Sequence, residues 1–401
     1  PFNPAQFYNN FYGLNVTSPL ENLRTTANNR NRENRLIGSG SATIHILPEL
    51  NFKSLFAIDR RNAFSSTFLD PLSTSWGRNQ FGEASDSRNM NTVLTFDNVL
   101  SYNKTFDKHG FEAMAGSSWT NSQYTSSYIL GSHFRSDLIE TLNAANKISW
   151  TATNSSASDW AMMSYFGRLS YNHDGKYLIT ANVRTDGSSK LHPDNRWSVF
   201  PSVSAAWRLS SEEFLKDVSW MNDLKIRGGW GQTGNQSGIG DYSYLQRYSI
   251  SRSPWFEEGK TNDLVSVSPA NLRANDLGWE RTTQTGVGLD FTGIDNRITV
   301  NLDYYYKKTT DMLMYVDLSG TGQIPSIQRN EGEMINKGFE ANVTSENFRG
   351  DFRWNTTFNI SFNKNELSKL TLQPVYLDAK TVDYVNDYVV RNEPGRPMGS
   401  F

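Results

Sequence analysis

The chain has 401 residues, of which 37% are hydrophobic, 20% charged and 13% aromatic, and its formal net charge at pH 7 is -2. A chain with this charge balance lacks the basic excess of a nucleic-acid-binding protein, and its aromatic content argues against intrinsic disorder. It contains no cysteine, which excludes disulfides, thiol catalysis and cysteine-ligated metal sites.

Apolar and polar residues alternate along most of the chain, which is the period of a strand with two different faces. No stretch approaches 18 continuous apolar residues, so no transmembrane helix is predicted. The one helix that we predict is short, SSEEFLKDVSW (Ser210–Trp220), with a serine cap and a glutamate three residues later. We predict twelve strands, near residues 40–47, 51–59, 91–104, 110–121, 162–172, 177–185, 197–209, 224–232, 280–292, 297–307, 337–346 and 352–364.

The connections between these strands alternate in length. Short ones, such as the Asp174-Gly175 turn, are followed by long ones at 60–90, 122–161, 185–196, 233–279 and 308–336. In an up-and-down meander, this alternation puts all short turns at one end and all long loops at the other. Transmembrane β-barrels have this arrangement, with short turns in the periplasm and long loops outside.

The strand faces agree with a barrel in a membrane. On 165–184, we expect Tyr165, Leu169, Ile179 and Val183 to meet lipid, whereas Arg168, Asn182 and Arg184 face a watery lumen. Aromatic residues at predicted strand ends are typical of interface girdles; they are Tyr177, Trp207, Trp230, Trp279, Tyr304, Tyr306 and Trp354. Alternation alone leaves open that the apolar face packs on a second sheet.

Five stretches resemble one family when taken together. They are YFGRLSYNHDGKYLITANVRTDGSSKLHPDNRWSVFPSVSAAWRLSSEEFL (165–215), LKIRGGWGQTGNQSGIGDYSY (224–244), LGWERTTQTGVGLDF (277–291), NRITVNLDYYYKKTTDMLM (296–314) and NEGEMINKGFEANV (330–343). Their order and spacing are similar to the barrel of SusC-like (SusC/RagA-type) TonB-dependent outer-membrane transporters of Bacteroidota. The resemblance is strong over 165–401 and loose over 1–164.

The resemblance implies a fold and a set of partners. Such transporters are 22-stranded barrels with an N-terminal plug. They import oligosaccharides or peptides, driven by the TonB–ExbB–ExbD complex, under a SusD-like lipoprotein lid, and tend to form dimers of transporter–lid pairs. We therefore expect residues 1–401 to be part of one transmembrane antiparallel β-barrel domain with long extracellular loops, without the plug and the final strands, in the bacterial outer membrane.

The candidate binding residues lie in the predicted long loops. Aromatic rings there offer stacking faces for sugars or pockets for peptide side chains; the ligand-binding candidates are Tyr242, Tyr244, Trp255, Phe256, Glu257, Trp150 and Trp160. We identify no catalytic constellation, cofactor motif or metal site, because GWGQTG (Gly229–Gly234) lacks the following helix of a dinucleotide site and the histidines form no helical pair. The prediction is a transporter rather than an enzyme.

Two other functions remain open at this point. The chain could belong to a non-importing outer-membrane barrel, either porin-like or part of a secretion or assembly complex. It could also be a secreted, soluble β-rich protein that binds glycans, with its apolar faces buried between two sheets.

Overall fold

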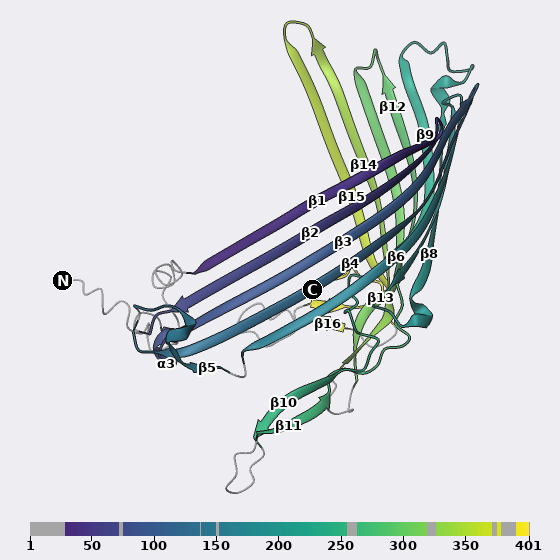
Figure 1. Ribbon diagram of the computed structural model, residues 1–401. Helices are drawn as coiled ribbons and strands as arrows, with labels where there is room; N and C mark the ends of the chain where they lie inside the picture. The colour runs from purple at the N-terminus through teal and green to yellow at the C-terminus, as the bar shows by residue number, and fades with distance from the viewer. Residues whose placement is uncertain are drawn as a thin grey trace, which may run out of the picture. The chain divides into compact units, whose positions relative to one another are not determined.

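The computed structural model describes residues 29–71, 75–136, 138–149, 152–254, 263–318, 326–370, 375–377 and 390–400. Its main sheet is a meander in which each long strand lies beside its neighbour in sequence (Figure 1). Twelve strands form this path: β1 (Arg30–Leu47), β2 (Leu50–Leu69), β3 (Glu83–Phe106), β4 (His109–Phe134), β6 (Asn154–His173), β7 (Tyr177–Ser188), β8 (Trp197–Arg208), β9 (Met221–Asn235), β12 (Glu280–Gly293), β13 (Ile298–Asp317), β14 (Ser326–Arg349) and β15 (Arg353–Leu370).

All twelve predicted strands are present, in the predicted order. The connections alternate in length as predicted except at 209–220, between β8 and β9, which is longer than the connections 189–196 and 318–325. The predicted ends are wrong for several strands, because the strands run further toward the long connections. β2 extends to Leu69, β4 to Phe134, and β14 begins at Ser326. Three stretches that we predicted as loops, 60–90, 122–161 and 308–336, are therefore largely strand. Their Ser-, Thr- and Asn-rich sequences look like loops, yet both faces of a strand that extends beyond a membrane can be polar.

The chain divides into two compact units. The first comprises Pro1–Ser41, Leu55–Phe96 and Thr120–Ala161, and it includes helix α3 (Ser75–Gln80) and the short strand β5 (Ala145–Ile148), which pairs with β4. Phe68, Ala84 and Phe134 are buried where β2, β3 and β4 meet the long connections. The Phe68 and Phe134 rings lie edge to face, 5.2 Å apart. This small core ties the long connections of the unit to the strand ends.

The second unit comprises Ala42–Ser54, Asp97–Trp119 and Met162–Phe401. From β6 to β15, every strand pairs antiparallel with the next one along the path. The β6–β7 turn shows how the sequence sets this pairing: Asp174 and Gly175 both have positive φ, as a type I′ hairpin turn requires. The Lys176 N–H donates to the His173 carbonyl at 2.9 Å and closes the turn.

The predicted helix at Ser210–Trp220 is wrong. The structure has a single 3-10 turn, η4 (Leu209–Ser211), followed by hydrogen-bonded turns. The expected cap is not made, because the Ser210 hydroxyl donates to the Asp223 carboxylate at 2.7 Å. Glu212 likewise accepts hydrogen bonds from side chains on β7 and β8. The side chains of Ser210 and Glu212, which would have capped and started the helix, thus bind partners on other elements instead. A helix this short is only marginally stable without such capping contacts.

Two hairpins form small sheets of their own. Strands β10 (Tyr248–Pro254) and β11 (Asp263–Pro269) lie within the longest connection, and β16 (Val375–Leu377) pairs with β17 (Val390–Asn392). Neither hairpin was predicted from the sequence. Within the residues that the structure describes, no helix is long and apolar enough to span a membrane.

Candidate functional site

The sheet of the second unit has an outward face that is apolar and exposed. Strand pairing sets its members side by side: Val203 lies opposite Trp230, Val287 opposite Tyr304, and Phe339 opposite Phe362. The four residues predicted to face lipid, Tyr165, Leu169, Ile179 and Val183, are 48–66% exposed. A soluble domain would cover an apolar surface of this extent.

Aromatic rings gather on this face beside the short turns. The Tyr171, His173, Tyr177 and Trp207 rings follow one another from β6 to β8, with neighbouring centroids 6.2–6.5 Å apart. Rings also gather at the other short turns of the unit: Phe106 with Phe111, Trp220 with Phe291, and Phe348 with Phe352 and Trp354. Aromatic rings in this position are typical of the interface girdle of a membrane barrel.

A second set of rings marks the other boundary of the apolar zone. Trp197 stacks on Tyr165 at 6.1 Å and lies opposite Gly187, whereas Trp207 lies opposite Tyr177. The two tryptophans are ten residues apart on β8, or about 33 Å along the strand. With the usual tilt of about 40°, this corresponds to about 25 Å across the membrane, the height of the apolar band of an outer-membrane barrel.

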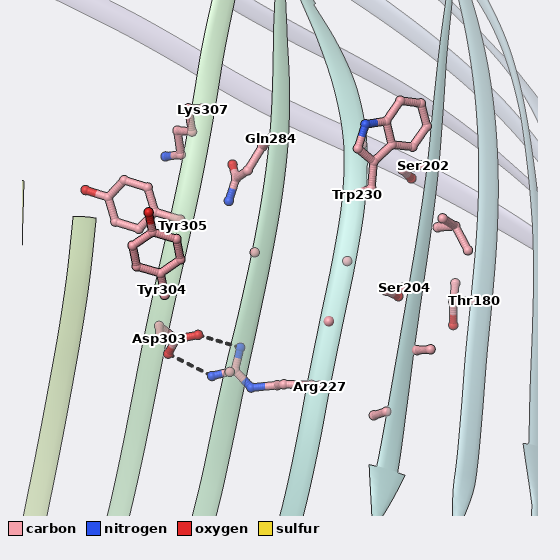
Figure 2. Close-up of a pocket in the computed structure, with 18 of the residues that line it drawn as sticks. Thr180, Ser202, Ser204, Arg227, Trp230, Gln284, Asp303, Tyr304, Tyr305 and Lys307 are labelled. Carbon is pink, nitrogen blue, oxygen red and sulfur yellow. Dashed lines mark hydrogen bonds and ion pairs between the residues drawn. The ribbon is translucent and has the colours of Figure 1, made fainter. Parts of the chain in front are cut away.

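The inward face of the same strands is polar and, at its centre, carries mostly small side chains. Two adjacent rows of paired residues consist mostly of serine and glycine, Ser202–Gly231–Gln284 and Ser204–Gly229–Gly286. Together with Tyr305 and Lys307 they line a hollow of about 760 Å³ (Figure 2). All three GWGQTG glycines therefore belong to strand β9, and Gly229 and Gly231 form part of its inner surface.

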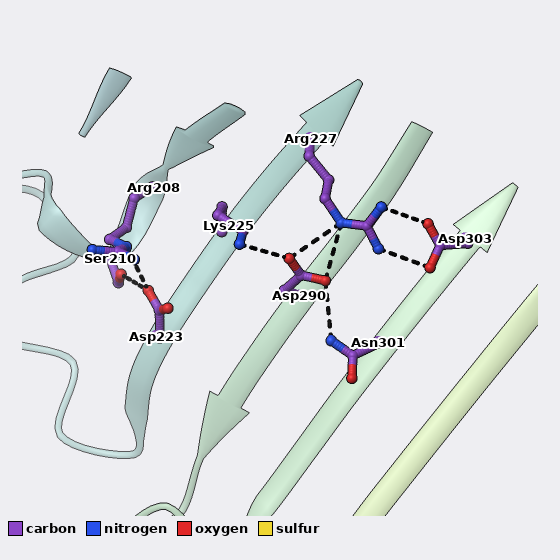
Figure 3. A network of polar contacts seen from close by, with 8 residues as sticks. All are labelled: Arg208, Ser210, Asp223, Lys225, Arg227, Asp290, Asn301 and Asp303. Carbon is purple, nitrogen blue, oxygen red and sulfur yellow. Dashed lines mark hydrogen bonds and ion pairs between the residues drawn. The ribbon is translucent and has the colours of Figure 1, made fainter. Parts of the chain in front are cut away.

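An ion-pair network crosses this face next to the hollow (Figure 3). Both terminal nitrogens of Arg227 on β9 bind the Asp303 carboxylate on β13 at 2.7 Å, and its Nε binds Asp290 on β12 at 3.2 Å. Lys225 Nζ and Asn301 Nδ2 complete the shell of Asp290 at 2.9 and 3.0 Å. Two cations and two carboxylates thus neutralise one another across three strands.

Gly288 makes this crossing possible. It stands between Arg227 and Asp303 in the paired row, and a Cβ atom there would lie 2.6 Å from the Arg227 Cζ. Tyr305 crosses Gly338 in the same way and reaches Asn363, two strands away, at 3.4 Å. Long side chains on the inward face therefore lie along the wall where a glycine leaves room, and do not project inward.

At the long-loop end, the connections pack into a buried core that we call the loop cluster: Leu191, Phe200, Ile239, Ala274, Leu277 and Trp279. Leu191, Ile239 and Leu277 are at most 1% exposed. The Trp279 indole donates to the Arg196 carbonyl at 3.0 Å, and Gln328 donates to the Gly238 carbonyl at 2.6 Å. Trp279 is thus a buried loop residue, and its predicted place in a girdle is wrong.

Two of the candidate binding residues lie beside the loop cluster. Tyr242 and Tyr244 lie in the turn that follows Ile239 and are half-buried, and the Tyr244 ring meets His192 edge to face at 6.1 Å. Beside them, Lys190 Nζ binds Asp241 at 3.1 Å and also donates to the Ile239 carbonyl. Both tyrosines are therefore set on a rigid base. The sequence signal for this base is the set of isolated apolar residues among Gly, Ser and Asn in the long connection, which we did not predict to be buried.

The structure does not bring the other candidates to this place. Trp160 was predicted in a loop but lies on strand β6, half-buried, in the first unit. Trp150, Trp255, Phe256 and Glu257 lie outside the described residues. Among the residues that are described, no three His, Asp or Glu side chains come together in a group that could hold a metal ion.

The pKa of the Glu212 carboxyl, at the short-turn end, is shifted by neighbouring side chains. The Tyr177 hydroxyl and the Trp207 indole both donate to Glu212 Oε1, at 2.6 and 3.0 Å. These bonds hold the pKa of the Glu212 carboxyl below its usual value, and the Lys176 ammonium adds a smaller effect in the same direction. Glu212 lies outside the strands, so it ties the girdle rings to the β8–β9 turn.

An antiparallel meander with an exposed apolar face, two aromatic girdles and a polar inward face is the wall of a transmembrane β-barrel. The chain belongs to the family described as TonB dependent receptor-like, beta-barrel, whose model matches residues 1–394. Membership places the chain in the bacterial outer membrane and removes the soluble glycan-binding alternative.

Two relatives match most of the chain. A TonB-dependent receptor of Formosa agariphila is 33% identical over 332 residues, which cover 82% of this chain and 31% of that receptor. The TonB-dependent receptor SusC of Bacteroides thetaiotaomicron is 31% identical over 375 residues, which cover 90% of this chain and 36% of SusC. The chain thus spans about a third of the length of these curated relatives.

Solved structures show the same fold. The RagAB peptide transporter superposes with a TM-score of 0.80 at 23% identity, over 93% of this chain and 40% of that one. The ferric citrate transporter FecA superposes with a TM-score of 0.54 at 8% identity, over 85% and 44%. The first similarity confirms the fold of the predicted barrel wall, and the identity to SusC supports its SusC-like type.

Proposed function

We propose that this chain is part of the barrel of an outer-membrane importer that is energised by TonB and takes up large nutrients, oligosaccharides or peptides. The observation that carries the proposal is the inward face, where small residues and side chains lying along the wall leave an open polar surface. A narrow, filled barrel would suit a structural role, whereas this surface leaves room for a large cargo or a movable plug. The 31% identity to SusC supports the TonB-dependent class.

The partners follow from the same proposal. A SusD-like lipoprotein would sit as a lid over the long-loop end, and the TonB–ExbB–ExbD complex would act through a plug. Transporter–lid pairs would associate as dimers. Cargo would bind between lid, loops and plug, with no bond chemistry. The rigid base beneath Tyr242 and Tyr244 supports a role for these rings in contacting cargo or lid, because a preorganised aromatic surface loses little entropy on binding.

The test is uptake in living cells that express the full-length protein. Labelled oligosaccharides and peptides of graded size are offered to wild-type cells, to cells lacking this protein and to cells lacking TonB. We expect one cargo class whose uptake is lost in both deletions, and a SusD-like lipoprotein that copurifies in mild detergent. Uptake that needs the protein but not TonB would overturn the proposal and favour the porin-like alternative.

A further inference from the structure

Three arginines of the first unit share the outward face of neighbouring strands; we call Arg32 on β1, Arg60 on β2 and Arg88 on β3 the outer arginine cluster. Their face follows from strand alternation. Glu33, Arg35, Asp59 and Arg61 bind one another across β1 and β2, so Arg32 and Arg60, one position away, point to the other side. Arg88 joins them, because its guanidinium lies over Phe64, 5.7 Å from the ring centroid.

The arginines on the two faces of these strands differ in their partners. On the inward face, Arg35 pairs with Asp59 and Arg61 with Glu33, both at 2.6 Å. Among the described residues, none of the outer cluster has a carboxylate partner, and Arg60 instead contacts the Met90 sulfur at 3.2 Å. Three arginines without a carboxylate partner among the described residues thus share one face of three neighbouring strands.

Two members of the cluster, Arg32 and Arg88, line a hollow of about 480 Å³. Arg32 and Arg88 stand at its sides, two strands or about 10 Å apart, and Asn34, Asn62, Phe64 and Met90 form its floor and wall. Guanidinium groups and amide nitrogens offer many donors around an apolar base. This combination fits a ligand with anionic oxygens at one end and hydrocarbon at the other.

The cluster also lies at a defined depth. On each strand it comes after an exposed apolar residue on the same face, Leu36, Phe56 or Phe96, in the direction of the long connections. Four residues separate Arg32 from Leu36 and Arg60 from Phe56, and eight separate Arg88 from Phe96. These separations are about 13 and about 26 Å along a strand, or about 10 and about 20 Å across the membrane at the usual tilt. Since long loops face outward in such barrels, the cluster extends outward from the headgroup level of the outer leaflet.

We propose that the outer arginine cluster binds the phosphate of an outer-leaflet lipid, with the acyl chains lying along Leu36, Phe56 and Phe96. Arginine forks match phosphate oxygens with paired hydrogen bonds, and basic residues close to a membrane surface attract anionic lipids. This lipid site goes beyond nutrient import and does not depend on it.

The test compares two double variants of the full-length protein in nanodiscs. R32Q/R88Q removes two charges from the outward face, and R35Q/R61Q removes two charges from the inward face of the same unit. Nanodiscs contain either neutral lipid alone or neutral lipid with a lipid bearing a phosphate monoester headgroup, and native mass spectrometry counts the bound lipid. A third arm adds inorganic phosphate to neutral nanodiscs. Thermal unfolding shows that each variant is folded.

We expect R32Q/R88Q to weaken binding of the phosphorylated lipid about 25-fold, about fivefold for each arginine near the surface, whereas R35Q/R61Q binds as the wild type does. Unchanged binding in R32Q/R88Q, or equal losses in both variants, would overturn the proposal. Inorganic phosphate that binds as tightly as the lipid would overturn the assignment to lipid. If R32Q/R88Q does not fold, the single variant R88Q is measured in its place, with an expected loss of about fivefold.

Discussion

Val183→Arg tests whether the outward face meets lipid. Val183 is half exposed and lies between Gly167 on β6 and Pro201 on β8, so no neighbouring side chain on these strands could pair with a guanidinium. It is six residues from Tyr177 and four from Gly187, which lies opposite Trp197. This places Val183 within about 3 Å of the middle of the apolar band.

An arginine at this depth should cost about 2–4 kcal/mol, falling to about 0–1 kcal/mol near the interfaces. The matched control is Thr180→Arg, three residues away on the inward face, where Thr180 has one side-chain hydrogen bond, to Ser170 at 3.1 Å. Loss of that bond should cost about 0.5–1.5 kcal/mol. The free energy of unfolding is measured by urea titration of the folded barrel in liposomes.

The comparison between the two variants decides the question. A Val183→Arg variant that is destabilised by at least about 1 kcal/mol more than Thr180→Arg would support lipid contact. A difference of this size can be resolved by denaturant titration. Equal costs would refute the assignment of the two faces, and a larger cost for Thr180→Arg would reverse it. Both variants keep the same charge change, so a general effect of net charge cancels.

Three further predictions concern the inward face, the short-turn end and the loops. Gly288→Ala should push the Arg227 guanidinium away from Asp303, because the new Cβ would lie 2.6 Å from its Cζ; a double-mutant cycle with Asp303→Asn in urea unfolding should give a coupling of about 0.5–1 kcal/mol, and independent effects would contradict the crossing. Glu212→Gln should reduce the pH dependence of stability, because the pKa of the Glu212 carboxyl is lowered in the folded state. The ionised carboxyl therefore stabilises the fold above its unfolded-state pKa, and this contribution is lost as the pH falls through its folded-state pKa. The unfolding midpoints of wild type and variant should converge in acid, whereas midpoints that stay parallel over the whole pH range would contradict the prediction. Leu277→Ala, at 1% exposure, should cost about 2–5 kcal/mol of local stability and speed hydrogen exchange in 236–247, whereas the exposed control Leu272→Ala should not, and similar exchange in both would mean that the loop cluster is not a core.

The sequence predicted the strands and their faces well because membrane strands obey one simple rule, alternation of two surfaces. Val183 and its neighbours could be placed from that rule alone. The loop cluster could not, since Leu277 and Trp279 owe their burial to contacts with connections up to about ninety residues away. Glu212 shows the same limit. Its local sequence favours the start of a helix, but in the fold its carboxylate accepts hydrogen bonds from Tyr177 on β7 and Trp207 on β8.

Two glycines of the inward face, Gly288 and Gly338, affect the width of the barrel lumen. Each of the two lets an arginine or a tyrosine from a neighbouring strand lie over it, so that the long side chain lines the wall without taking space from the lumen. A substitution at Gly288 or Gly338 would therefore narrow the passage by more than its own methyl group, because it would also raise the long side chain that now lies flat. The bore of such a transporter can in this way be tuned at positions that themselves touch nothing that passes through.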